Sequence, residues 1–360
     1  MILSHKCFKN KKSNSEMKLM KKIYWLSIFT FFLSCVQNPN TEKHQKNREN
    51  ILNVKDKVVA INFENSMFSS IVQCYLLNNY IIISDLRSSN KLIHIFDRTS
   101  FKHIISSIDK GRGPGEITNM GYIFTDEQKN SFLVSDHGKN AVFTYNIDSL
   151  ILNPLYLPSV FMEMGKRQFP DEYKFINDSL LIGKMIMVSP SSSFNQEICR
   201  INPKTGEYKP MKYSHKKIDV KRVSFDASLE NNIYVECYNY YDLITICTLD
   251  GELKYNIYGK YWNAQDGKKY RYYDDVAFCN DKILVLYADG KDNIYKGNNG
   301  ELFVGRPTKV LVFEKNGDYV RTLDIGMKIN SFCFDQMNNR LIMVTDEDPQ
   351  FTYLDLKDLV

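Results

Sequence analysis

Short apolar runs alternate with polar turns along almost the whole chain. Runs rich in Ile, Val, Leu, Phe and Tyr are separated by Asn, Asp and Gly, and almost no helical periodicity is visible after residue 50. β-Branched and aromatic residues favour strands, whereas Asn, Asp and Gly favour the turns between them. The pattern therefore predicts an all-β protein.

One motif recurs six times along this pattern. It consists of Asn or Asp, four or five apolar-rich residues, a polar turn and another strand, and its reference positions are Asn78, Asn130, Asn177, Asn231, Asn280 and Asn338. The steps between them are 52, 47, 54, 49 and 58 residues, and a propeller blade of four strands takes about 40–50 residues. We therefore expect a six-bladed β-propeller of four-stranded antiparallel blades over residues 51–360. A β-sandwich, whose strands also recur with turn signals, is the alternative.

The sixth repeat is one strand short. Its expected strands are 330–335, 341–345 and 351–356, and the chain ends at residue 360. An unassigned strand, Lys57–Phe63 (KVVAINF), precedes the first repeat. We expect this N-terminal strand to complete the last blade, because ring closure removes an unpaired sheet edge.

The formal net charge of +5 is misleading, because the basic residues are concentrated at the N-terminus. Residues 1–34 hold seven Lys and one acid, Glu16, so the remainder has 40 basic and 41 acidic side chains. Nucleic-acid binding requires clustered excess positive charge. The composition therefore argues against a nucleic-acid partner.

The N-terminus has the organisation of an export signal. An 11-residue apolar run, Ile23–Leu33, follows three Lys and precedes Ser34-Cys35; it is too short to span a membrane, which takes about 20 residues. Phe32-Leu33-Ser34-Cys35 resembles a bacterial lipoprotein lipobox, in which cleavage precedes a Cys that is then lipidated. The alternative is an ordinary cleaved signal followed by a chance Cys.

Three segments follow from this interpretation. We expect a lipoprotein signal peptide at 1–34, a lipidated Cys35 with a flexible tether over 35–50, and the propeller at 51–360. Met17 and Met20 are alternative starts that give a signal of normal length. The tether assignment rests on the polar composition of residues 36–50.

Six further cysteines lie in the predicted propeller: Cys74, Cys199, Cys237, Cys247, Cys279 and Cys333. None has CxxC or another metal-ligand spacing. Cys237 and Cys247 flank one predicted hairpin and are the only pair we suspect of oxidation. We favour buried free thiols within strands over this pairing, because Cys packs as a small hydrophobic residue.

Two acids, Asp85 and Asp136, end the second strands of the first two repeats. A catalytic role is conceivable, but a short carboxylate at a strand end also accepts backbone N–H groups from the next turn, and we expect that structural role. The segment Phe132–Asn146 (FLVSDHGKNAVFTYN) resembles an NHL-repeat blade, which carries such an Asp.

A glycine-rich loop joins the first two repeats. It reads GRGPGE: Gly111, Arg112, Gly113, Pro114, Gly115 and Glu116. No Lys-Ser/Thr pair and no predicted helix follows, so it is not a phosphate loop. A structural corner is favoured over a ligand loop, because Gly and Pro mark turns first.

This GRGPGE loop, together with Tyr145–Ser159 (YNIDSLILNPLYLPS), resembles the TolB-like six-bladed propeller family, whose members are commonly bacterial lipoproteins. The resemblance spans roughly residues 50–360 and is sharpest between 85 and 160. It implies a propeller fold and an envelope location, but no agreed activity or catalytic residues.

Strand parity predicts which loops share one face of the ring. Loops from strand two to three and from strand four to the next blade lie on the same side, and aromatic and Arg side chains on loops are typical of binding surfaces. The alternative is that these rings pack the blades together. The ligand-face candidates are Tyr240, Tyr241, Tyr261, Trp262, Arg271, Tyr272 and Tyr273.

Signals for catalysis are weak. The chain contains no GxSxG, HExxH or CxxC motif. Asp226, Asp274, Asp275 and Asp335 could supply the metal site of a lactonase- or lyase-type propeller enzyme in the central channel, which is the alternative function. We expect no catalytic residue, cofactor or metal.

These observations predict a monomeric, exported, lipid-anchored binding or scaffold module for an envelope protein, peptide or glycan. A sensor domain that signals to an envelope partner is a further hypothesis, and fold alone does not decide among them.

Overall fold

A computed structural model describes residues 41–63, 66–153, 155–190, 194–263, 270–290, 294–296 and 302–360. The chain divides into two units, Met1–Thr41 and Glu42–Val360, and the fold below is that of the second. The predicted signal peptide and Cys35 lie outside the described residues.

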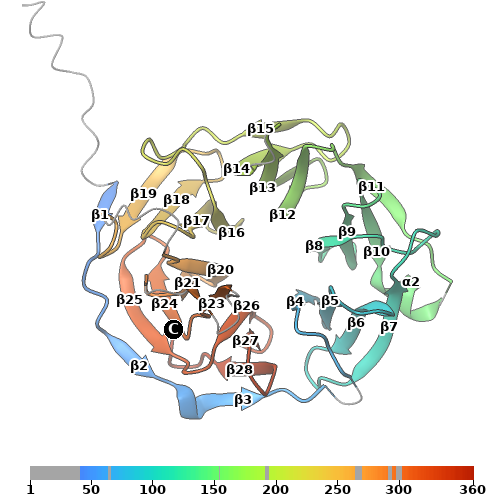
Figure 1. The fold of residues 1–360 in the computed structure, drawn as a ribbon, viewed down its shortest axis with the longest axis horizontal. Helices are drawn as coiled ribbons and strands as arrows, with labels where there is room; N and C mark the ends of the chain where they lie inside the picture. Colours follow the sequence, from blue (N-terminus) through green and yellow to red (C-terminus); the bar gives the residue numbers. More distant parts are fainter. Residues whose placement is uncertain are drawn as a thin grey trace, which may run out of the picture. The chain divides into compact units, whose positions relative to one another are not determined.

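Six antiparallel sheets surround a central axis, as Figure 1 shows. Each sheet is one blade, and its first strand lies nearest the axis, so the predicted six-bladed propeller is confirmed. Blade 1 contains β4 (Val72–Leu77), β5 (Tyr80–Asp85), β6 (Lys91–Asp97) and β7 (His103–Asp109); blade 2 contains β8 (Met120–Asp126), β9 (Ser131–Asp136), β10 (Ala141–Asn146) and β11 (Ser159–Glu163); blade 3 contains β12 (Gln168–Asn177), β13 (Leu180–Val188), β14 (Phe194–Ile201) and β15 (Tyr208–Pro210).

The other three blades also recruit strands from the N-terminal segment. Blade 4 contains β16 (Val223–Ser228), β17 (Ile233–Tyr238), β18 (Leu243–Thr248) and β19 (Leu253–Tyr258); blade 5 contains β20 (Tyr273–Cys279), β21 (Lys282–Tyr287), β24 (Lys309–Glu314) and β25 (Tyr319–Asp324); blade 6 contains β26 (Ile329–Asp335), β27 (Arg340–Thr345), β28 (Phe351–Asp355) and β3 (Val58–Ala60).

The ring closes as the sequence predicts. β3 is the fourth strand of blade 6, antiparallel to β28, with Val59 opposite Tyr353. The unassigned N-terminal strand therefore covers the edge that the last repeat leaves open.

The N-terminal segment continues along the outside of two more blades, and we call residues 42–60 the N-terminal belt. β1 (Glu42–His44) is parallel to β19, and β2 (Ile51–Asn53) is parallel to β25. Figure 1 shows the belt in blue along the rim of the ring. The flexible tether expected over 35–50 is corrected here for residues 42–50, because backbone pairing with blade 4 holds β1 in place.

Asparagines in the turns after the inner strands account for the repeat in the sequence. Five of these turns have an Asn with a left-handed φ between 47° and 54°. Asn adopts this conformation more readily than other residues with a side chain. The positions are Asn78, Asn130, Asn232, Asn280 and Asn339.

The core consists of six hydrophobic clusters, one at each interface between neighbouring blades. Cys237 belongs to the cluster between blades 4 and 5, whereas Cys247 belongs to the cluster between blades 3 and 4. The favoured interpretation of buried free thiols is therefore confirmed: Cys237 and Cys247 face opposite sides of one sheet, and both are free.

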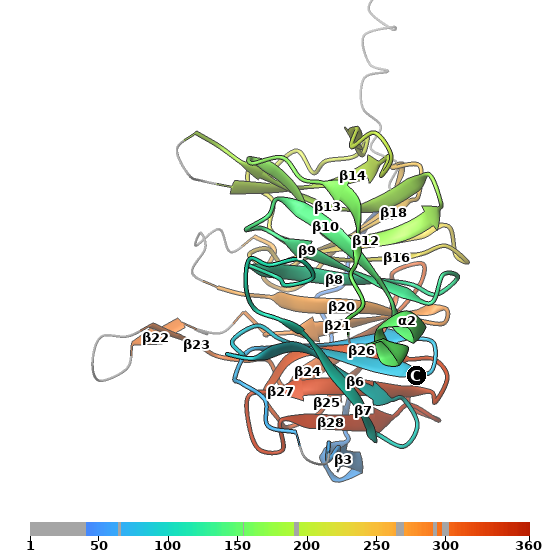
Figure 2. The same cartoon turned by 90° about the vertical axis from the view of Figure 1, so that its right-hand side faces the viewer.

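Three smaller elements complete the described fold, and two of them project from opposite faces of the ring. Figure 2 shows the hairpin of β22 (Ile294–Lys296) and β23 (Leu302–Val304) extending from one face and α2 (Ile147–Leu152) on the other. The third is a 3-10 turn, η2 (Lys55–Lys57), in the belt. The sequence pattern did not predict α2, whose first turn is capped by Asn146 accepting from the Ser149 backbone N–H.

Candidate functional site

The inner strands enclose a central cavity of about 840 Å³. Side chains from all six blades line it, including Tyr75, Tyr122, Glu172 and Asp226. Ligands commonly bind in concave cavities of this kind. The charged groups that line this cavity determine which ligands it can bind.

The charged groups of the cavity form ion pairs with one another. The Lys184 ammonium lies 3.0 Å from a carboxylate oxygen of Asp171 and 3.0 Å from one of Glu172. The Lys174 ammonium lies 3.1 Å from Asp226. The two Lys184 pairs link β12 and β13 within blade 3, whereas the Lys174–Asp226 pair joins β12 of blade 3 to β16 of blade 4.

Two channel acids also connect successive blades through the backbone. Asp226 accepts the Phe278 N–H at 2.8 Å, and Asp275 accepts the Phe332 N–H at 2.9 Å. Burial raises the pKa of Asp275 to about 7, and the nearby negative charge of Glu172 acts in the same direction. The carboxylates thus fasten the inner strand β16 to β20 and β20 to β26.

The four acids considered for a metal do not converge on one point. Asp226, Asp274 and Asp275 line the cavity, and Asp274 lies 2.8 Å from the Arg271 guanidinium. Asp335 lies between Arg98 and Arg340, at 2.7 and 2.8 Å. Within the described residues, no group of three or more His, Cys, Asp or Glu side chains is arranged to hold a metal ion.

The glycine-rich loop is internally bonded. The Gly113 N–H donates to the Glu116 carboxylate at 2.6 Å, and the Lys139 ammonium donates to the carbonyls of Gly113 and Glu116 at 2.8 and 2.7 Å. A Cβ on Gly111 would lie 2.0 Å from that carboxylate, and Gly115 has a φ of 77°. These contacts support the structural corner, and its exposed positions are Arg112 and Pro114.

The strand-end acids have the structural role that the sequence predicts. Asp136 accepts the backbone N–H groups of Thr118, Asn119 and Gly138 at 2.9–3.0 Å. Asp85 accepts the Ser69 N–H at 2.9 Å and the Arg87 N–H at 3.2 Å. Both carboxylates therefore hold the turns beside their strands.

Three loops on one face of the ring meet at Trp262. Its ring centroid lies 6.2 Å from Tyr241 in the β17–β18 loop, 5.1 Å from His215 in the β15–β16 loop and 4.7 Å from Tyr258 at the end of β19. Trp262, Tyr240, Tyr241 and Tyr261 are all half-buried. We call these four residues the aromatic loop cluster.

Basic side chains surround this cluster. The Lys217 ammonium lies 6.0 Å from the Trp262 ring centroid, and the Lys260 ammonium lies 5.4 Å from that of Tyr261. Arg222 stacks at 3.7 Å on Phe194, an exposed ring on β14. Partly exposed rings with cations above them can bind a negatively charged partner that also presents an apolar surface.

The other aromatic candidates are not on the surface, which corrects part of the predicted ligand face. Tyr272 and Tyr273 are 2% and 0% exposed, because both pack between blades 4 and 5. The Tyr273 hydroxyl donates to Asp242 at 2.6 Å and accepts from Arg48 at 2.8 Å. Arg271 forms the ion pair with Asp274 described above.

The N-terminal belt is connected to the aromatic loop cluster by a chain of hydrogen bonds. The Lys217 N–H donates to His215 Nδ1, so His215 Nε2 donates to the Tyr258 hydroxyl at 3.1 Å. Tyr258 in turn donates to the Glu42 carboxylate. Burial lowers the pKa of His215, which favours its neutral form.

Arg48 is a second link between the belt and the cluster. Its guanidinium lies 3.2 Å from Asp242, whose side chain is fully buried, and Asp242 accepts the Tyr261 N–H at 3.0 Å. The guanidinium also lies over the rings of Tyr287 and Phe313. The belt thereby fixes the loop that carries Tyr261.

The sequence pattern indicates the aromatic residues of the cluster but not its basic residues or the N-terminal belt. The segment 211–222 (MKYSHKKIDVKR) contains six basic residues if His215 is counted. This local concentration of positive charge is the sequence feature from which the basic surroundings of the cluster could be predicted. Nothing in the sequence indicates that Arg48 reaches Asp242, because the two lie 194 residues apart.

Comparison with known families agrees with the fold. The family model DUF5128, described as a 6-bladed beta-propeller, matches residues 63–235. The chain is similar to that family over this stretch. No curated protein is significantly similar in sequence to the chain. The narrower TolB-like resemblance stays a prediction.

Solved structures give the same fold at low sequence identity. A member of the duf4221 family from Bacteroides vulgatus is 12% identical, with a TM-score of 0.53 over 83% of this chain and 95% of its own. A candidate exported protein of Bacteroides fragilis is 13% identical, with a TM-score of 0.51 and coverage of 84% and 87%. A luciferin-regenerating enzyme is 9% identical, with a TM-score of 0.52 and coverage of 82% and 94%. At these identities the likeness establishes the fold and not the activity.

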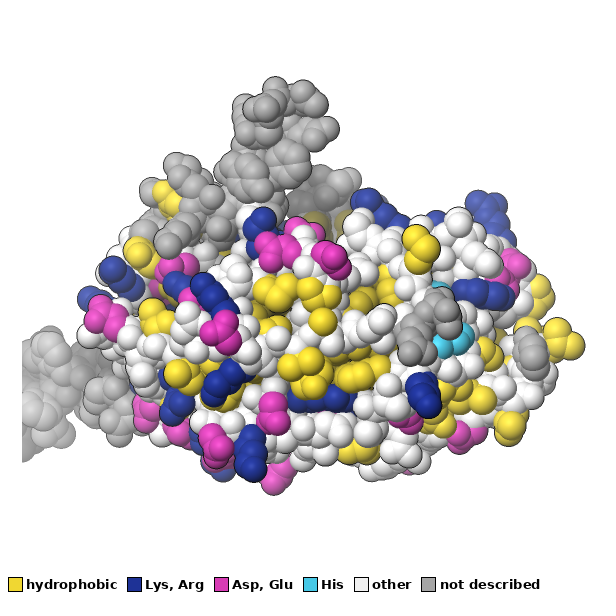
Figure 3. Space-filling model, turned by 90° about the horizontal axis from the view of Figure 1, so that it is seen from below, with side chains coloured by type: hydrophobic (Ala, Val, Ile, Leu, Met, Phe, Trp, Pro, Cys, Tyr) yellow, Lys and Arg dark blue, Asp and Glu magenta, His cyan; other side chains and the backbone are white. Residues whose placement is uncertain are grey.

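Two further features concern the distribution of charge on the surface and the length of the helices. Figure 3 shows one side of the ring, where acidic and basic side chains are interspersed without one continuous patch of either sign. Among the described residues, no helix is long and apolar enough to cross a membrane.

Proposed function

We propose that the chain is a non-catalytic binding module of the bacterial cell envelope, exported and anchored through a lipid on Cys35. In this proposal the aromatic loop cluster and its basic surroundings bind an envelope protein, peptide or glycan that carries negative charge. The observation that carries the proposal is the meeting of three loops at Trp262, with Lys217 and Lys260 over the half-buried rings of Trp262 and Tyr261.

The charge pattern of the channel supports this choice of site. Lys174, Lys184, Asp226 and Asp275 are engaged with one another or with the backbone of the next blade. By contrast, Lys216, Lys217 and Lys260 are exposed beside the cluster. Fewer existing contacts are lost when a partner docks on the loops than when a ligand replaces the channel pairs.

Export has two supports. The apolar run at Ile23–Leu33 followed by Ser34-Cys35 has the form of a lipoprotein signal. One structural neighbour from Bacteroides fragilis is itself described as a candidate exported protein.

The Trp262 ring provides the test of the binding site. Trp262→Ala removes the centre of the cluster, and we expect partner binding to weaken by about 2 kcal/mol or more. Because the ring is half-buried, we expect a stability loss of about 1–2 kcal/mol, below the ~3–5 kcal/mol of a core truncation. The measurements are pull-down from detergent-solubilised envelope and thermal melting of the same variant.

Charge variants make this test specific. Lys217→Glu is expected to reduce capture, whereas Lys102→Glu, at an exposed position in blade 1, is expected to leave it unchanged. A chain that starts at residue 41 contains Trp262 as its single Trp, so its fluorescence reports partner binding directly. Equal capture by all variants, or a stability loss of about 3–5 kcal/mol in Trp262→Ala as for a core truncation, would contradict a platform at this position.

The lactonase- or lyase-type alternative places a metal among the channel acids. Metal content of the purified full chain distinguishes it: a stoichiometric divalent cation that is lost in Asp226→Asn and Asp275→Asn variants would favour the enzyme over the binding module.

A further inference from the structure

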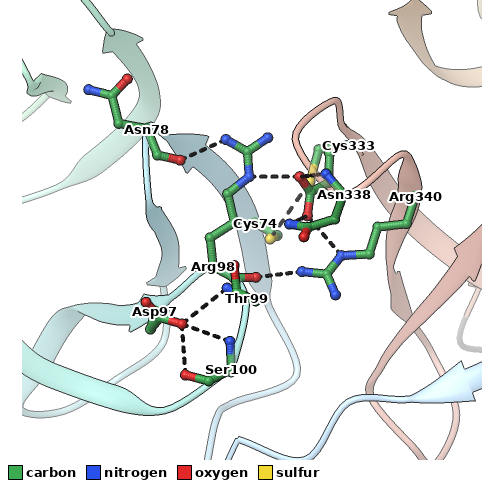
Figure 4. Close-up of polar contacts among 10 residues, drawn as sticks. Cys74, Asn78, Asp97, Arg98, Thr99, Ser100, Cys333, Asn338 and Arg340 are labelled. Atoms are coloured by element: carbon green, nitrogen blue, oxygen red, sulfur yellow. Dashed lines mark hydrogen bonds and ion pairs between the residues drawn. The ribbon is translucent and has the colours of Figure 1, made fainter.

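Two cysteines meet where the first and last blades join. Cys74 lies on β4 in blade 1 and Cys333 on β26 in blade 6, 259 residues apart in sequence. Their sulfur atoms are 3.8 Å apart, with the Cys333 thiol donating to the sulfur of Cys74. Figure 4 shows the two side chains pointing toward each other across the seam.

The surrounding contacts join β26 to blade 1. Arg98, which follows β6 in blade 1, lies 2.7 Å from Asp335 at the end of β26, and Arg340 contacts the same carboxylate at 2.8 Å. Arg340 also donates to the Arg98 carbonyl (Figure 4). Arg98 also donates to the carbonyl of Asn78, directly after β4, at 2.7 Å, so bonds independent of the sulfur atoms connect the two strands that carry them.

The pair also differs from the other described cysteines in accessibility. Cys74 and Cys333 are half-buried and line the central cavity, so a small thiol reagent in the channel can reach them. The other four are buried: Cys199, Cys237, Cys247 and Cys279. A disulfide has sulfur atoms about 2.05 Å apart, so each side chain has to move by roughly 1 Å, which a modest χ1 rotation supplies.

We propose that Cys74 and Cys333 form a redox site, at which oxidation by an exchanging disulfide joins the first and last blades covalently. The Cys74 thiolate attacks one sulfur of the incoming disulfide, forms a mixed disulfide and releases the first thiol. Cys333 then loses its proton and attacks the Cys74 sulfur, which forms the Cys74–Cys333 bond and releases the second thiol. Two electrons pass from the cysteine pair to the incoming disulfide, which leaves as two thiols.

The order of the two steps follows from the local contacts. The hydrogen bond to Cys74, followed by burial, raises the pKa of Cys333 well above its usual range. Cys333 therefore stays protonated until the mixed disulfide is in place. The product is a ring whose closure no longer depends only on noncovalent contacts.

The test uses the full chain, divided into one sample treated with oxidised glutathione and one treated with a reductant. We expect digestion without reductant to give a linked peptide pair containing Cys74 and Cys333 from the oxidised sample only. We also expect the oxidised protein to melt roughly 5 °C or more above the reduced protein, because the bond closes a very long loop.

Matched variants assign this shift to the pair. Cys74→Ala and Cys333→Ala are expected to abolish the difference in melting temperature between the two treatments, whereas Cys279→Ala keeps it. Peptide mapping of the unchanged protein decides the question even where a variant fails to fold. The absence of the linked pair, a link to another cysteine, or an equal shift in Cys74→Ala would overturn the proposal.

Discussion

At the scale of single residues, the turn asparagines connect the sequence repeat to the fold. Asn280 has a φ of 54° and is exposed, and its carbonyl accepts a hydrogen bond from Asn231. A left-handed conformation costs most other residues about 1–2 kcal/mol, whereas Gly adopts it freely.

We therefore expect Asn280→Val to lower the free energy of unfolding by about 1–2 kcal/mol and Asn280→Gly to change it by less than about 0.5 kcal/mol. Chemical denaturation of both variants measures the difference. Equal effects of Val and Gly would show that the backbone at this turn relaxes out of the left-handed region.

Asp275 gives the ring a dependence on pH. Its pKa is raised to about 7, chiefly by burial, from an ordinary value of 3.8. A raised pKa means that the folded state holds the proton more tightly than the unfolded chain. The stabilising contribution of this group is therefore fully present and constant below about pH 4. It falls as the pH rises from about 4 to about 7, and the free energy of unfolding no longer changes with this group above that range.

We expect the Asp275→Asn variant to lose this component of the pH dependence, which is on the order of 2–4 kcal/mol between pH 4 and pH 8. Denaturant titrations of both proteins at several pH values provide the measurement. Parallel stability curves for the two proteins would exclude Asp275 as the titrating group.

The roles of single residues could be predicted from the sequence where local backbone geometry determines them. The strand-end acids and the turn asparagines follow from local backbone chemistry. The burial of Tyr273 cannot be predicted from local backbone chemistry, because its hydroxyl is held by Asp242 and Arg48, which lie in distant parts of the chain.

At the scale of secondary-structure elements, the N-terminal belt is the least predictable part of the fold. β1 and β2 are three residues long, and their sequences, Glu-Lys-His and Ile-Leu-Asn, carry almost no apolar periodicity. Backbone hydrogen bonds to exposed edges hold them instead. β3 was predictable only because the sixth blade lacks a strand.

Substitution of Arg48 measures how much the attachment of the belt contributes to the free energy of unfolding. Arg48→Ala leaves the buried carboxylate of Asp242 without its cation, and breaking a buried pair in this way typically costs about 3–5 kcal/mol. We expect a loss of that size in chemical denaturation, together with weaker partner capture because Tyr261 loses its support.

The exposed neighbour Lys46 supplies the matched control, and Lys46→Ala is expected to leave stability within about 0.5 kcal/mol of the unchanged protein. If both alanine variants were equally stable, the belt would contribute little to the ring.

At the scale of the whole molecule, the blade count and the mode of ring closure could be derived from the sequence. Repeat spacing gives the number of blades, and the strand count gives the origin of the missing strand. The binding partner could not be derived, because the cluster at Trp262 is assembled from three loops whose meeting depends on the finished ring.

Membrane attachment is a prediction about the whole molecule. Cys35→Ala removes the residue expected to carry the lipid, so we expect the protein to move from the membrane fraction to the soluble fraction. Mass spectrometry of the N-terminus and membrane fractionation are the measurements. A Ser34→Ala variant keeps a small residue before Cys35 and is expected to remain attached.

Unchanged fractionation of Cys35→Ala, with no lipid mass on the N-terminus of the unaltered protein, would rule out the anchor while leaving the proposed binding site open to its own test.

The N-terminal belt also constrains the order of events during synthesis. Glu42 bonds to Asn256, 214 residues later, and Asn50 bonds to the Val320 carbonyl, 270 residues later. β1, β2 and β3 are therefore synthesised well before their partners: β1 waits for β19, which ends at residue 258, whereas β2 and β3 wait for β25 and β28, which end at residues 324 and 355. Contacts of such sequence separation slow folding, and unpaired strands invite wrong pairing until they are covered. The charges of Glu42, Lys43, Lys46 and Arg48 oppose such wrong pairing, and the ring can close only once β28 has been synthesised.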